Sequence, residues 1–586
     1  MDEPSDEVLA LIRKYALQNA LEYGGEGQVG SVMGRVMGEN PDLRSMAKAI
    51  SPLIAKSVTE ANDLAKSAGL DHLKSILKKE SPDALEERVK ERRTGLPPLP
   101  NAVDGKVVLR FAPNPNGPLS LGHSRGITIN SELAKMHDGV VILRFDDTDT
   151  RIKPPDPDAY KIIEDEFTWL TGRSPDRIIR ASERMPIYLE YAERLLAEAA
   201  GYVCTCPAES FKEYRISMSN CPCRGRTGEQ NLELWISMLD GSMPPGGGVV
   251  RIRTDMTLPN PALRDWPALR IQHDSHPIVG DAYRVWPLLD FQSAIEDHLQ
   301  GVTHIVRGKD LMDSTRKQIL LYEKFEWEYP ETLYWGRIKV HGLASFSTSE
   351  MRKLIESGQR TGWGDVRLPT LKALRRRGYE PEAIRKFWVE IGLTQKDISV
   401  PMQTLDALNG GQIDSTTPRL TFVRDPIPAK FSANTDLKLP PPTPSIHPEH
   451  PNLGLRQWPE QNGEIDVLIE VVDATSKSDR FRLKDFADVE FDEETANDEN
   501  VDDGTLSGKV LSSERLGRTR IIHWLPAGFG EPVIMLKPDG DDLLEIHGIL
   551  EPHDYPVGTI IQLERIGYAR IEMDDDGKIQ LIHLHD

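Results

Sequence analysis

Hydrophobic residues recur every three to four positions along the first hundred residues of the chain. Between residues 7 and 23, Leu11, Ile12 and Tyr15 fall on one side of a helix with 3.6 residues per turn. A charged helical stretch at 85–93 is followed by Gly95 and two prolines, which do not continue a helix. The pattern therefore predicts a helical N-terminal region that ends near residue 100.

A different rhythm begins at residue 106, where short apolar runs alternate with amphipathic segments. Strands are predicted at 107–111, 140–145, 177–180 and 303–307, and helices at 121–136, 158–170, 294–299 and 314–325. Alternating strands and helices are typical of an α/β fold with a doubly wound parallel sheet of the Rossmann type. The stretch 201–285 breaks this alternation, and we interpret it as an insertion between two halves of the sheet.

The pattern changes again toward the C-terminal end. Residues 366–409 are predicted to be helical, and the proline-rich segment 426–452 cannot sustain a regular helix. Later β-rich runs at 466–472, 518–523, 558–566 and 578–583 favour antiparallel barrels. The predicted parts are a helical domain at 1–100, the sheet halves at 101–200 and 286–345, the insertion at 201–285, a loop and helical region at 346–418, and β-barrels at 419–586.

Composition narrows the class of protein. A content of 39% hydrophobic and 28% charged residues is ordinary for a globular chain. No apolar run approaches the ~20 residues of a membrane-spanning helix. The acidic start, from Met1 to Leu9, lacks the basic and apolar regions of a secretory signal. We therefore expect a cytoplasmic protein without a membrane partner.

The net charge of −21 argues against unspecific binding to nucleic acid, because phosphates favour basic surfaces. Much of the acid lies in one run at 485–503, however, and a basic cluster stands at Arg375-Arg376-Arg377. Binding depends on the local field rather than on the global sum. A substrate RNA held on one face is compatible with this charge distribution.

The segment Arg110 to His123 reads RFAPNPNGPLSLGH and lies between a predicted strand and a predicted helix. Loops at this position hold ligands at the carboxyl end of a parallel strand. Gly117 and Gly122 let the backbone approach a ligand, the first helix amides favour phosphate, and His123 can donate to a phosphate oxygen. Read alone, these residues also fit a tight turn followed by a helix cap.

This segment resembles the first signature of class I aminoacyl-tRNA synthetases, usually His-Ile-Gly-His. Its flanks are closely similar to those of glutamyl- and glutaminyl-tRNA synthetases. Ser120 stands where the family has its first histidine, and a serine hydroxyl could partly replace that donor. The resemblance implies catalytic roles for Ser120, Gly122 and His123, and ATP contacts from Asn116, Gly117, Gly122 and His123.

Two further blocks are similar to the amino-acid pocket of the same family. In LRFDDTD, at 143–149, the position of Asp146 binds the ammonium group of the substrate in the family. In DHLQGVTHIVRGKDL, at 297–311, Arg307 resembles a clamp on the side-chain carboxylate of glutamate, together with Arg110. Arginine suits a carboxylate because its donors form a rigid fork. Glutaminyl enzymes typically lack this arginine, so Arg307 favours glutamate.

Two other positions bear on the same pocket. Ser293 is expected to contact the amino acid. Leu289 stands where the family often has tyrosine, and because leucine cannot donate a hydrogen bond, the pocket wall must differ here. Read without the resemblance, an arginine at a strand end is more often part of a surface salt bridge.

The segment SFSTSEMRK, at 345–353, falls where the second class I signature, Lys-Met-Ser-Lys-Ser, belongs. Neither lysine is in place, and Thr348 stands at the position of the second one. A related Ser-Thr-Ser pattern occurs in archaeal glutamyl enzymes, so the resemblance implies ATP contacts from Ser347, Thr348 and Ser349. Arg352 or Lys353 is the candidate for the missing positive charge.

The resemblance extends over about 101–586. Segments 368–378, 521–526 and 557–570 are similar to the helical region under the tRNA and to the C-terminal barrels of archaeal and eukaryotic glutamyl enzymes, where bacterial ones have helices. It implies tRNA contacts from Arg375, Arg376 and Arg377, binding of the acceptor end at the insertion, and binding of the anticodon by the barrels. Residues 1–100 resemble the archaeal extension only loosely.

All four cysteines lie close together, as Cys204, Cys206, Cys221 and Cys223. Two Cys-x-Cys pairs can supply four thiolates to a tetrahedral zinc ion, although structural sites usually have two residues inside each pair. Some glutamyl synthetases carry zinc in this insertion. Zinc and free thiols both stay open at this point.

The resemblance implies an enzyme that joins glutamate to tRNA. ATP, with Mg2+, would activate L-glutamate as glutamyl-adenylate, and the 3′ end of tRNA(Glu) would take the glutamyl group; tRNA(Gln) as a second substrate is left open. A monomer is expected. The alternatives are a glutaminyl-tRNA synthetase and an inactive synthetase-like RNA-binding protein. A nucleotide-binding dehydrogenase is excluded because no G-x-G-x-x-G follows the first strand.

Overall fold

The computed structural model describes residues 5–39, 43, 47–81, 95–342, 347–434, 439, 441–461, 463–473, 480–492 and 505–586. The chain separates into two compact units, Met1–Arg93 and Thr94–Asp586, and each has its own hydrophobic core. The predicted helical stretch 85–93 lies outside the described residues. Among those that are described, no helix is both long and apolar enough to span a bilayer.

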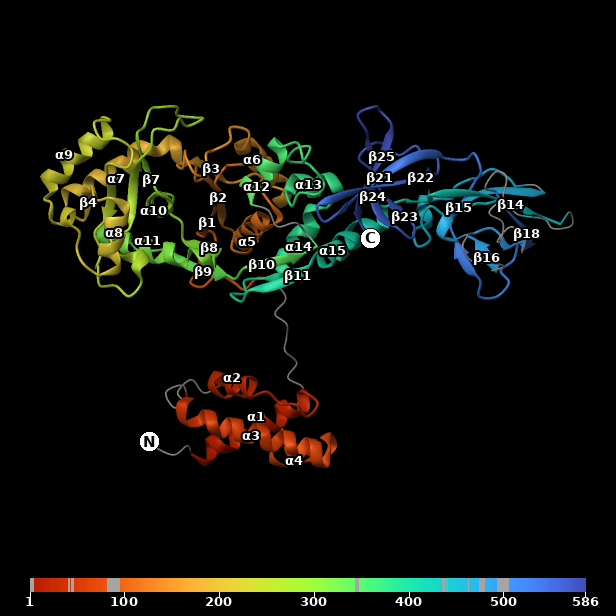
Figure 1. Cartoon of the computed structure of the whole chain (residues 1–586), viewed down its shortest axis with the longest axis horizontal. Coiled ribbons are helices and arrows are strands. Elements are labelled where there is room, and N and C mark those ends of the chain that lie inside the picture. The colour runs from red at the N-terminus through yellow and green to blue at the C-terminus, as the bar shows by residue number, and fades with distance from the viewer. Residues whose placement is uncertain are drawn as a thin grey trace. The chain divides into compact units, whose positions relative to one another are not determined.

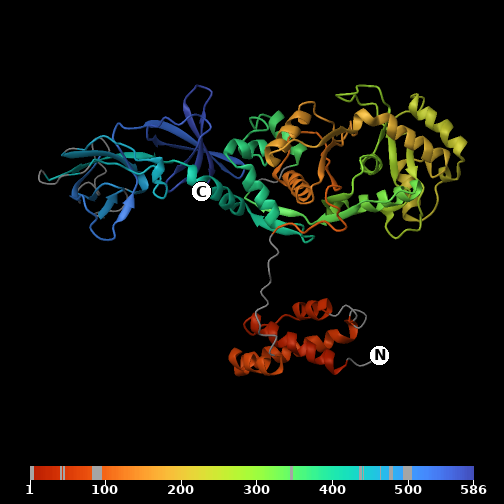
Figure 2. The ribbon, with the colours of Figure 1, turned by 180° about the vertical axis from the view of Figure 1, so that it is seen from behind.

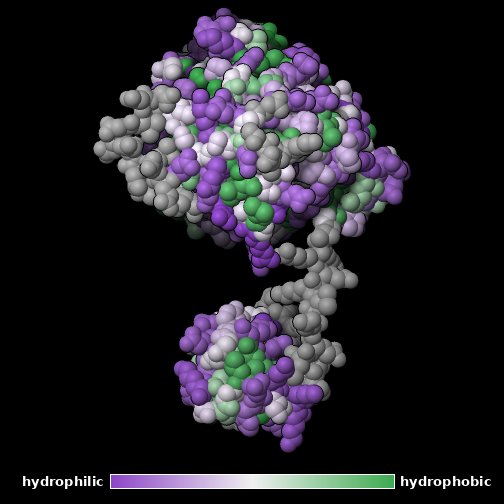
Figure 3. Space-filling view, turned by 90° about the vertical axis from the view of Figure 1, so that its right-hand side faces the viewer, coloured by the Kyte–Doolittle hydropathy of each residue, from purple (hydrophilic) through white to green (hydrophobic). Residues whose placement is uncertain are grey.

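The N-terminal unit is helical, as its periodicity predicts (Figure 1). Its helices are α1 (Asp6–Glu22), α2 (Val29–Glu39), α3 (Ala47–Ala68) and α4 (Leu70–Glu80). Their apolar faces meet in a core that includes Ile12, Ile54 and Leu73. Figure 3 shows an apolar patch framed by hydrophilic residues on one face of this unit.

The second unit begins with a five-stranded parallel arrangement. Its strands are β1 (Val108–Phe111), β2 (Val140–Phe145), β3 (Arg177–Arg180), β8 (His304–Gly308) and β9 (Glu331–Trp335). β2 pairs with β1 and β3, and β8 pairs with β9. The Thr303 N–H donates to Val108 O at 3.0 Å, which places β8 on the other side of β1. The order β3-β2-β1-β8-β9 reverses direction beside β1, so the predicted doubly wound sheet is confirmed.

Helices follow the strands as the sequence pattern predicts. They are α5 (Leu121–Met136), α6 (Ala159–Thr171), α7 (Met185–Ala197), α10 (Leu289–Leu299) and α11 (Met312–Phe325). All but the first residue of β2 are buried, as in a central parallel strand, whereas β3 is half exposed at the edge. The core of this region includes Leu109, Leu143 and Phe167.

The insertion forms its own antiparallel sheet, in the order β4-β5-β6-β7. The elements are β4 (Gly201–Cys204), α8 (Ala208–Ile216), α9 (Gly228–Leu239), β5 (Val249–Ile252), β6 (Pro267–Ile271) and β7 (Val285–Pro287). Trp235, Trp266 and Trp286 are buried in its core. Figure 2 shows this part beyond the parallel sheet, at the end away from the C-terminus.

Residues 338–416 are mainly helical, with one difference from the prediction. The elements are β10 (Ile338–His341), α12 (Thr348–Glu356), α13 (Leu371–Arg377), α14 (Pro381–Ile391), β11 (Ile398–Pro401) and α15 (Met402–Ile413). β11 interrupts the helices and pairs in parallel with β10. The prediction that 366–409 is helical is wrong at this point, because the alternating pattern of Ile398 and Val400 suits a strand.

Two seven-stranded sheets form the C-terminal region. The first has the order β12 (Arg419–Leu420), β23 (Ile560–Leu563), β24 (Gly567–Met573), β25 (Ile579–His585), β21 (Glu531–Asp539), β22 (Asp542–Leu550) and β13 (Phe422–Arg424). The second has the order β19 (Arg520–Ile522), β16 (Arg480–Leu483), β17 (Asp488–Phe491), β18 (Leu506–Ser512), β14 (Pro426–Ser432), β15 (Glu464–Glu470) and β20 (Trp524–Pro526).

Both sheets curl until their edges nearly meet. In the first, the two edge strands β12 and β13 are separated in the chain by Thr421 alone, and in the second, β19 and β20 are separated by His523 alone. One residue spans only ~3.5 Å, so the chain passes directly from one edge strand of each sheet to the other, and their adjoining ends must lie close together. The predicted barrels are confirmed, but they are not purely antiparallel, because four ladders, including β14–β18 and β21–β25, are parallel.

Candidate active site

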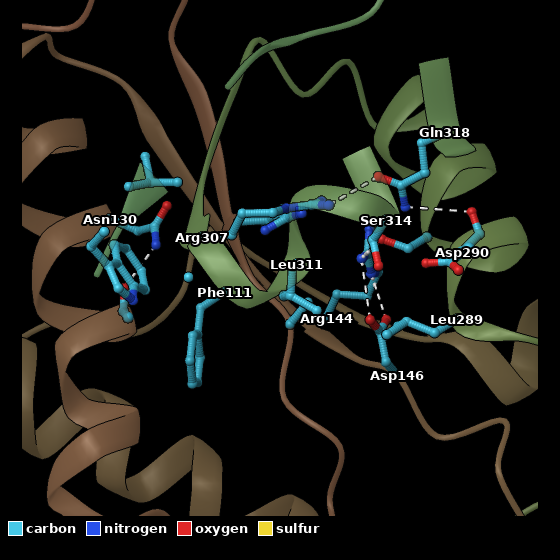
Figure 4. Close-up of a pocket in the computed structure, with 17 residues that line it drawn as sticks. Phe111, Asn130, Arg144, Asp146, Leu289, Asp290, Arg307, Leu311, Ser314 and Gln318 are labelled. Carbon is cyan, nitrogen blue, oxygen red and sulfur yellow. Dashed lines mark hydrogen bonds and ion pairs between the residues drawn. The ribbon is translucent and has the colours of Figure 1, made fainter. Parts of the chain in front are cut away.

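A pocket lies where the order of the parallel sheet reverses, at the carboxyl ends of β1 and β8. β1 contributes Arg110, β2 contributes Arg144, and β8 contributes Arg307. Figure 4 shows Arg307 reaching toward Gln318, and Arg144 lying close to Asp146. Open doubly wound sheets bind ligands at such switch points. The pocket therefore unites the residues that the sequence assigns to the amino acid.

Asp297 of α10 lies beneath the pocket and is fully buried. Its Oδ1 accepts hydrogen bonds from Arg144 Nη1 at 2.6 Å and Arg110 Nε at 3.1 Å, and its Oδ2 accepts from Arg110 Nη2 at 3.3 Å. Burial alone would raise the pKa of this carboxyl, but Arg110 and Arg144 outweigh it and lower the pKa to about 2. Asp297 is thus a fixed anion that orients two guanidinium groups.

Arg144 joins this anion to the second carboxylate of the pocket. Its Nε donates to Asp146 Oδ1 at 2.7 Å, and its Nη2 donates to Ser293 Oγ at 2.7 Å. Gln292 Nε2 also donates to Asp146 Oδ1, at 3.0 Å. The carboxylate of Asp146 is therefore held in one orientation at the pocket wall. Ser293 lines the same pocket, and its hydroxyl accepts from Arg144.

Arg307 is the arginine of the pocket with the weakest pairing. Its Nη2 lies 3.9 Å from Asp297 Oδ2, and its Nη1 donates to the neutral Gln318 Oε1 at 3.1 Å. The buried Nε has no hydrogen-bond partner among the described residues. Burial and then repulsion by Arg110 lower the pKa of Arg307. This guanidinium group is thus held in place by neutral acceptors and keeps its charge toward the pocket.

The charges of this network do not cancel. Among the described residues that form it, the guanidinium groups of Arg110, Arg144 and Arg307 face the two carboxylates of Asp146 and Asp297. One positive charge is left over, and the weak pairing of Arg307 places it there. An anionic group of a ligand complements such a buried charge, whereas a neutral group leaves it uncompensated.

The outer wall of the pocket carries Leu289 and Asp290. Leu289 lines the pocket and is 48% exposed, so the expected loss of a hydrogen-bond donor at this wall agrees with its position. Asp290 pairs with Lys317 at 2.7 Å, which keeps that carboxylate from opposing the positive charge of Arg307. Gln318 is itself positioned by Tyr329, whose hydroxyl donates to Gln318 Oε1 at 2.7 Å.

His123 and Ser120 form the start of α5. Ser120 Oγ accepts from the His123 N–H at 3.4 Å, and His123 Nδ1 accepts from the Ser120 N–H at 3.2 Å. Because Nδ1 accepts this bond, the proton of the neutral imidazole resides on Nε2. The His123 side chain is exposed, so its Nε2–H can donate a hydrogen bond to a ligand. Ser120 caps the helix, which gives its hydroxyl a positioning role.

The two signature segments lie against each other. A Cβ at Gly117, whose φ is 147°, would stand 2.8 Å from Thr348 Cγ2, so only glycine allows this approach. Arg352 Nη2 donates to Asn116 O at 2.8 Å and to Asp156 Oδ2 at 3.0 Å. Ser347 caps α12. Of this signature segment, Ser345 and Phe346 lie outside the described residues.

Comparison with known proteins gives a consistent result. The family described as "tRNA synthetases class I (E and Q), catalytic domain" matches residues 106–415. A glutamate–tRNA ligase of Pyrococcus abyssi is 42% identical over 99% of this chain and 100% of its own length. One of Methanothrix thermoacetophila is 43% identical over 97% of this chain and 98% of its own. The chain belongs to the class I tRNA synthetases.

One solved structure of a glutamate tRNA ligase, from Elizabethkingia meningosepticum, covers 53% of this chain and 70% of its own at 20% identity. Its TM-score of 0.38 is too low to add to the family assignment.

The cysteines of this class I tRNA synthetase gather at the start of the insertion. Cys204 ends β4, and Cys223 lies in the short helix that follows Cys221. The sulfurs of Cys204 and Cys221 are 4.0 Å apart, and those of Cys206 and Cys223 are 3.6 Å apart. All four thiols are free and lie within reach of one ion, a geometry compatible with either of the two alternatives that the sequence left open.

The three arginines predicted to bind tRNA differ in their surroundings. Arg376 pairs with Glu572 of β24 at 2.7 Å, and Arg377 donates to Leu584 O of β25. Both bonds hold α13 against the first barrel. Arg375 is exposed, with its guanidinium group 5.5 Å from the ring of Trp169. Only Arg375 is therefore presented to a partner in the way that the prediction requires.

Sequence reasoning did not single out Arg144 and Gln318, which line this pocket, or Asp297, which lies beneath it. Arg144 stood inside a recognised block, but only Asp146 of that block was singled out. Asp297 began another recognised block, and Gln318 belonged to none. A signal did exist for the first two, because an arginine inside a buried strand and an aspartate on a buried helix both need partners.

Proposed function

We propose that this chain is a glutamate–tRNA ligase, which activates L-glutamate with ATP and transfers it to the 3′ end of tRNA(Glu). The observation that carries this proposal is the uncompensated charge at Arg307 in an otherwise paired, buried pocket. The side-chain carboxylate of glutamate neutralises that charge, whereas the amide of glutamine cannot. The curated relatives described above are named glutamate–tRNA ligases, which supports the same substrate.

In the first step, the α-carboxylate of glutamate attacks the α-phosphate of ATP, and pyrophosphate leaves. Asp146 binds the substrate ammonium group, and Arg307 binds the side-chain carboxylate, with Arg110 beside it. His123 donates from Nε2 to a phosphate oxygen, and Asn116, Gly117, Gly122 and the α12 start line the nucleotide. Catalysis then rests on positioning and on donors set in advance. The terminal ribose hydroxyl of tRNA takes the glutamyl group in the second step.

Magnesium fits this scheme as a partner of ATP rather than of a protein cage. Within the described parts of the chain, the groups that could hold a metal are the four cysteines and the set Asp414, His447 and His450. Neither belongs to the signature segments. Mg2+ keeps several waters and is usually bound through substrate phosphates with one or two carboxylates. We therefore assign Mg2+ to the ATP phosphates.

The cysteine cluster fits a structural zinc ion. Tetrahedral zinc at about 2.3 Å from each sulfur separates the sulfurs by about 3.8 Å. The observed separations of 3.6 Å and 4.0 Å lie on either side of this value. The backbone N–H of Thr205 donates to Cys223 Sγ at 3.4 Å, a bond that favours a thiolate.

Metal analysis tests the zinc assignment. We expect about one zinc per chain, loss of the metal in Cys223→Ser, and a lower melting temperature after chelation. A zinc-free preparation with four reactive thiols and an unchanged melting temperature would establish free cysteines instead.

We assign tRNA binding to the insertion for the acceptor end and to 419–586 for the anticodon. Barrels of this type bind splayed single-stranded bases. Tyr568 and Leu584 of the first barrel belong to the same core as the catalytic helices, so this barrel is not a separable module. Arg375 is the exposed member of its cluster and the best candidate for a phosphate contact. A monomer remains our prediction from the family resemblance, and a cytoplasmic location remains our prediction from the sequence pattern.

Aminoacylation tests the proposed function. The full chain is supplied with ATP, Mg2+, tRNA(Glu) or tRNA(Gln), and labelled glutamate or glutamine. We expect glutamate to be attached to tRNA(Glu), and the tRNA(Gln) reaction decides whether charging discriminates between the two tRNAs. Attachment of glutamine instead would establish a glutaminyl-tRNA synthetase. No charging and no glutamate-dependent pyrophosphate exchange would favour an inactive RNA-binding relative.

A further inference from the structure

Arg144 is the most deeply embedded charge of the pocket and has no role in the scheme above. It is 1% exposed, and its guanidinium group donates to both carboxylates of the network and to Ser293. Its bond to Asp297 Oδ1, at 2.6 Å, is shorter than either bond from Arg110 to that carboxylate. Arg144 therefore shares Asp297 with the fork of Arg110 and neutralises part of its charge.

The alternative partner of Asp297 is Arg307. Arg307 Nη2 stands 3.9 Å from Asp297 Oδ2, which is an ion-pair distance but not a hydrogen bond. If Arg144 were absent, Asp297 would have one guanidinium partner instead of two at short range. The charge of Asp297 that Arg144 no longer neutralises would then act on Arg307, whose Nε has no partner in the described residues. That interaction would neutralise the charge that is offered to the substrate.

We infer that Arg144 is a specificity-determining positioning residue: by engaging Asp297, it leaves Arg307 without a hydrogen-bonded carboxylate of the protein and so available to the side-chain carboxylate of the amino acid. This inference rests on the proposed glutamate–tRNA ligase function and explains how its substrate is chosen. Arg144 also orients Asp146, but glutamate and glutamine share the same ammonium group. Any loss through Asp146 thus affects both amino acids equally and cancels in the ratio of their specificity constants.

The charge count predicts the effect of each change. Arg144→Gln leaves two guanidinium groups against two carboxylates, so no positive charge remains to favour glutamate. Arg144→Lys keeps the charge while it loses the fork that bridges both carboxylates. The double change Arg144→Gln with Asp297→Asn leaves two guanidinium groups against Asp146 alone, which restores one uncompensated charge. Removing both partners of a buried ion pair also destabilises the fold less than removing one, because no buried charge is left unpaired.

The experiment measures kcat/KM for glutamate and for glutamine in pyrophosphate exchange, with tRNA(Glu) present. We expect Arg144→Gln to lower the glutamate-to-glutamine ratio at least tenfold, and Arg144→Lys to lower it less. The double variant should recover most of the preference for glutamate. The control is Glu296→Gln, which removes a neighbouring buried carboxylate of α10 that pairs with Arg184 and Tyr188 outside the pocket. Its ratio should stay unchanged.

Two outcomes would overturn the inference. One is an Arg144→Gln variant in which both specificity constants fall by the same factor, because Arg144 would then act through Asp146 or through the fold alone. The other is a folded double variant that has lost the preference for glutamate, a result that decides the question even if the single variant does not fold. Failure of the proposed function is a separate result, since the unmodified protein itself would then show no glutamate-dependent exchange.

Discussion

Two buried carboxylates show how differently the two halves of this active site are built. Asp297, under the amino-acid pocket, is surrounded by arginines, which lower its pKa to about 2. Glu166 of α6 lies under the first signature loop and accepts the Leu119 N–H at 2.8 Å. Burial raises the pKa of Glu166 to about 8, because backbone donors and more distant cations offset only part of the desolvation. One region is organised by charge and the other by neutral hydrogen bonds.

This difference matches what each region has to recognise. Two backbone hydrogen bonds hold the signature loop in place. The Leu121 N–H donates to Pro369 O at 2.9 Å, and the Leu371 N–H donates to Leu119 O at 2.7 Å. These bonds fix the backbone shape of the loop to which the proposed function assigns ATP. In the proposed function, the amino-acid pocket must separate two ligands of nearly equal shape, and we propose that it does so by leaving one charge uncompensated. Substitutions in the two regions should therefore have different effects on the reaction.

The largest effect is expected at the nucleotide side. His123→Ala removes a donor that the Ser120 cap holds in place. The activation free energy of glutamate-dependent pyrophosphate exchange should rise by roughly 3–4 kcal/mol, which slows the reaction about 10²–10³-fold. Affinity for tRNA should be nearly unchanged. His137→Ala, at the other end of α5, is the matched control. A rate for His123→Ala within threefold of the parent would exclude the proposed role.

A smaller but more selective effect is expected at the amino-acid side. Arg307→Cys should lower kcat/KM for glutamate at least tenfold, about 1.4 kcal/mol, with little change in KM for ATP. Use of glutamine should suffer less, because its amide does not need the guanidinium charge. Arg316→Cys, at an exposed arginine of the next helix, α11, is the control. Unchanged glutamate kinetics in folded Arg307→Cys would remove the basis for choosing glutamate.

The smallest effect on activity is expected at Glu166, where the change appears in stability instead. Its folded pKa lies above its ordinary value of 4.5, so the protonated form is favoured by folding. The stability that this proton provides is present at low pH and is lost as the pH rises toward 8, by an amount on the order of a few kcal/mol. Glu166→Gln stays uncharged and still accepts the Leu119 N–H.

Melting curves at two pH values check this prediction. Between pH 5 and pH 8, the melting temperature of Glu166→Gln should fall less than that of the parent, and the variant should be the more stable protein at pH 8. Equal shifts in both proteins would show that Glu166 does not titrate in this range.

Much of the nucleotide side was predictable because its determinants are local. The run Val140–Phe145 and the helix Leu121–Met136 fall at their predicted bounds, since an apolar strand and an N-cap serine are both visible in a few residues. The carboxyl-end position of the signature loop then follows from the doubly wound topology. Residue roles in that loop still depended on the family resemblance.

The amino-acid side was predictable only in part. Arg110, Arg144 and Asp297 meet because α10 packs beneath two strands that lie more than 140 residues earlier in the chain. No local sequence pattern predicts that packing. The role of Arg144 as a bridge between Asp146 and Asp297 could therefore not be predicted. The mixed pairing of the barrels has the same cause, since ladders such as β12–β23 join residues far apart in sequence.

The central claim is that one uncompensated positive charge selects glutamate. Its most direct test is the ratio of kcat/KM for glutamate and glutamine in the unmodified protein, measured by pyrophosphate exchange with tRNA(Glu) present. A buried charge that faces a neutral amide should cost about 3–5 kcal/mol, so glutamate should be preferred by about a hundredfold or more. Equal use of both amino acids, or a preference for glutamine, would contradict this account.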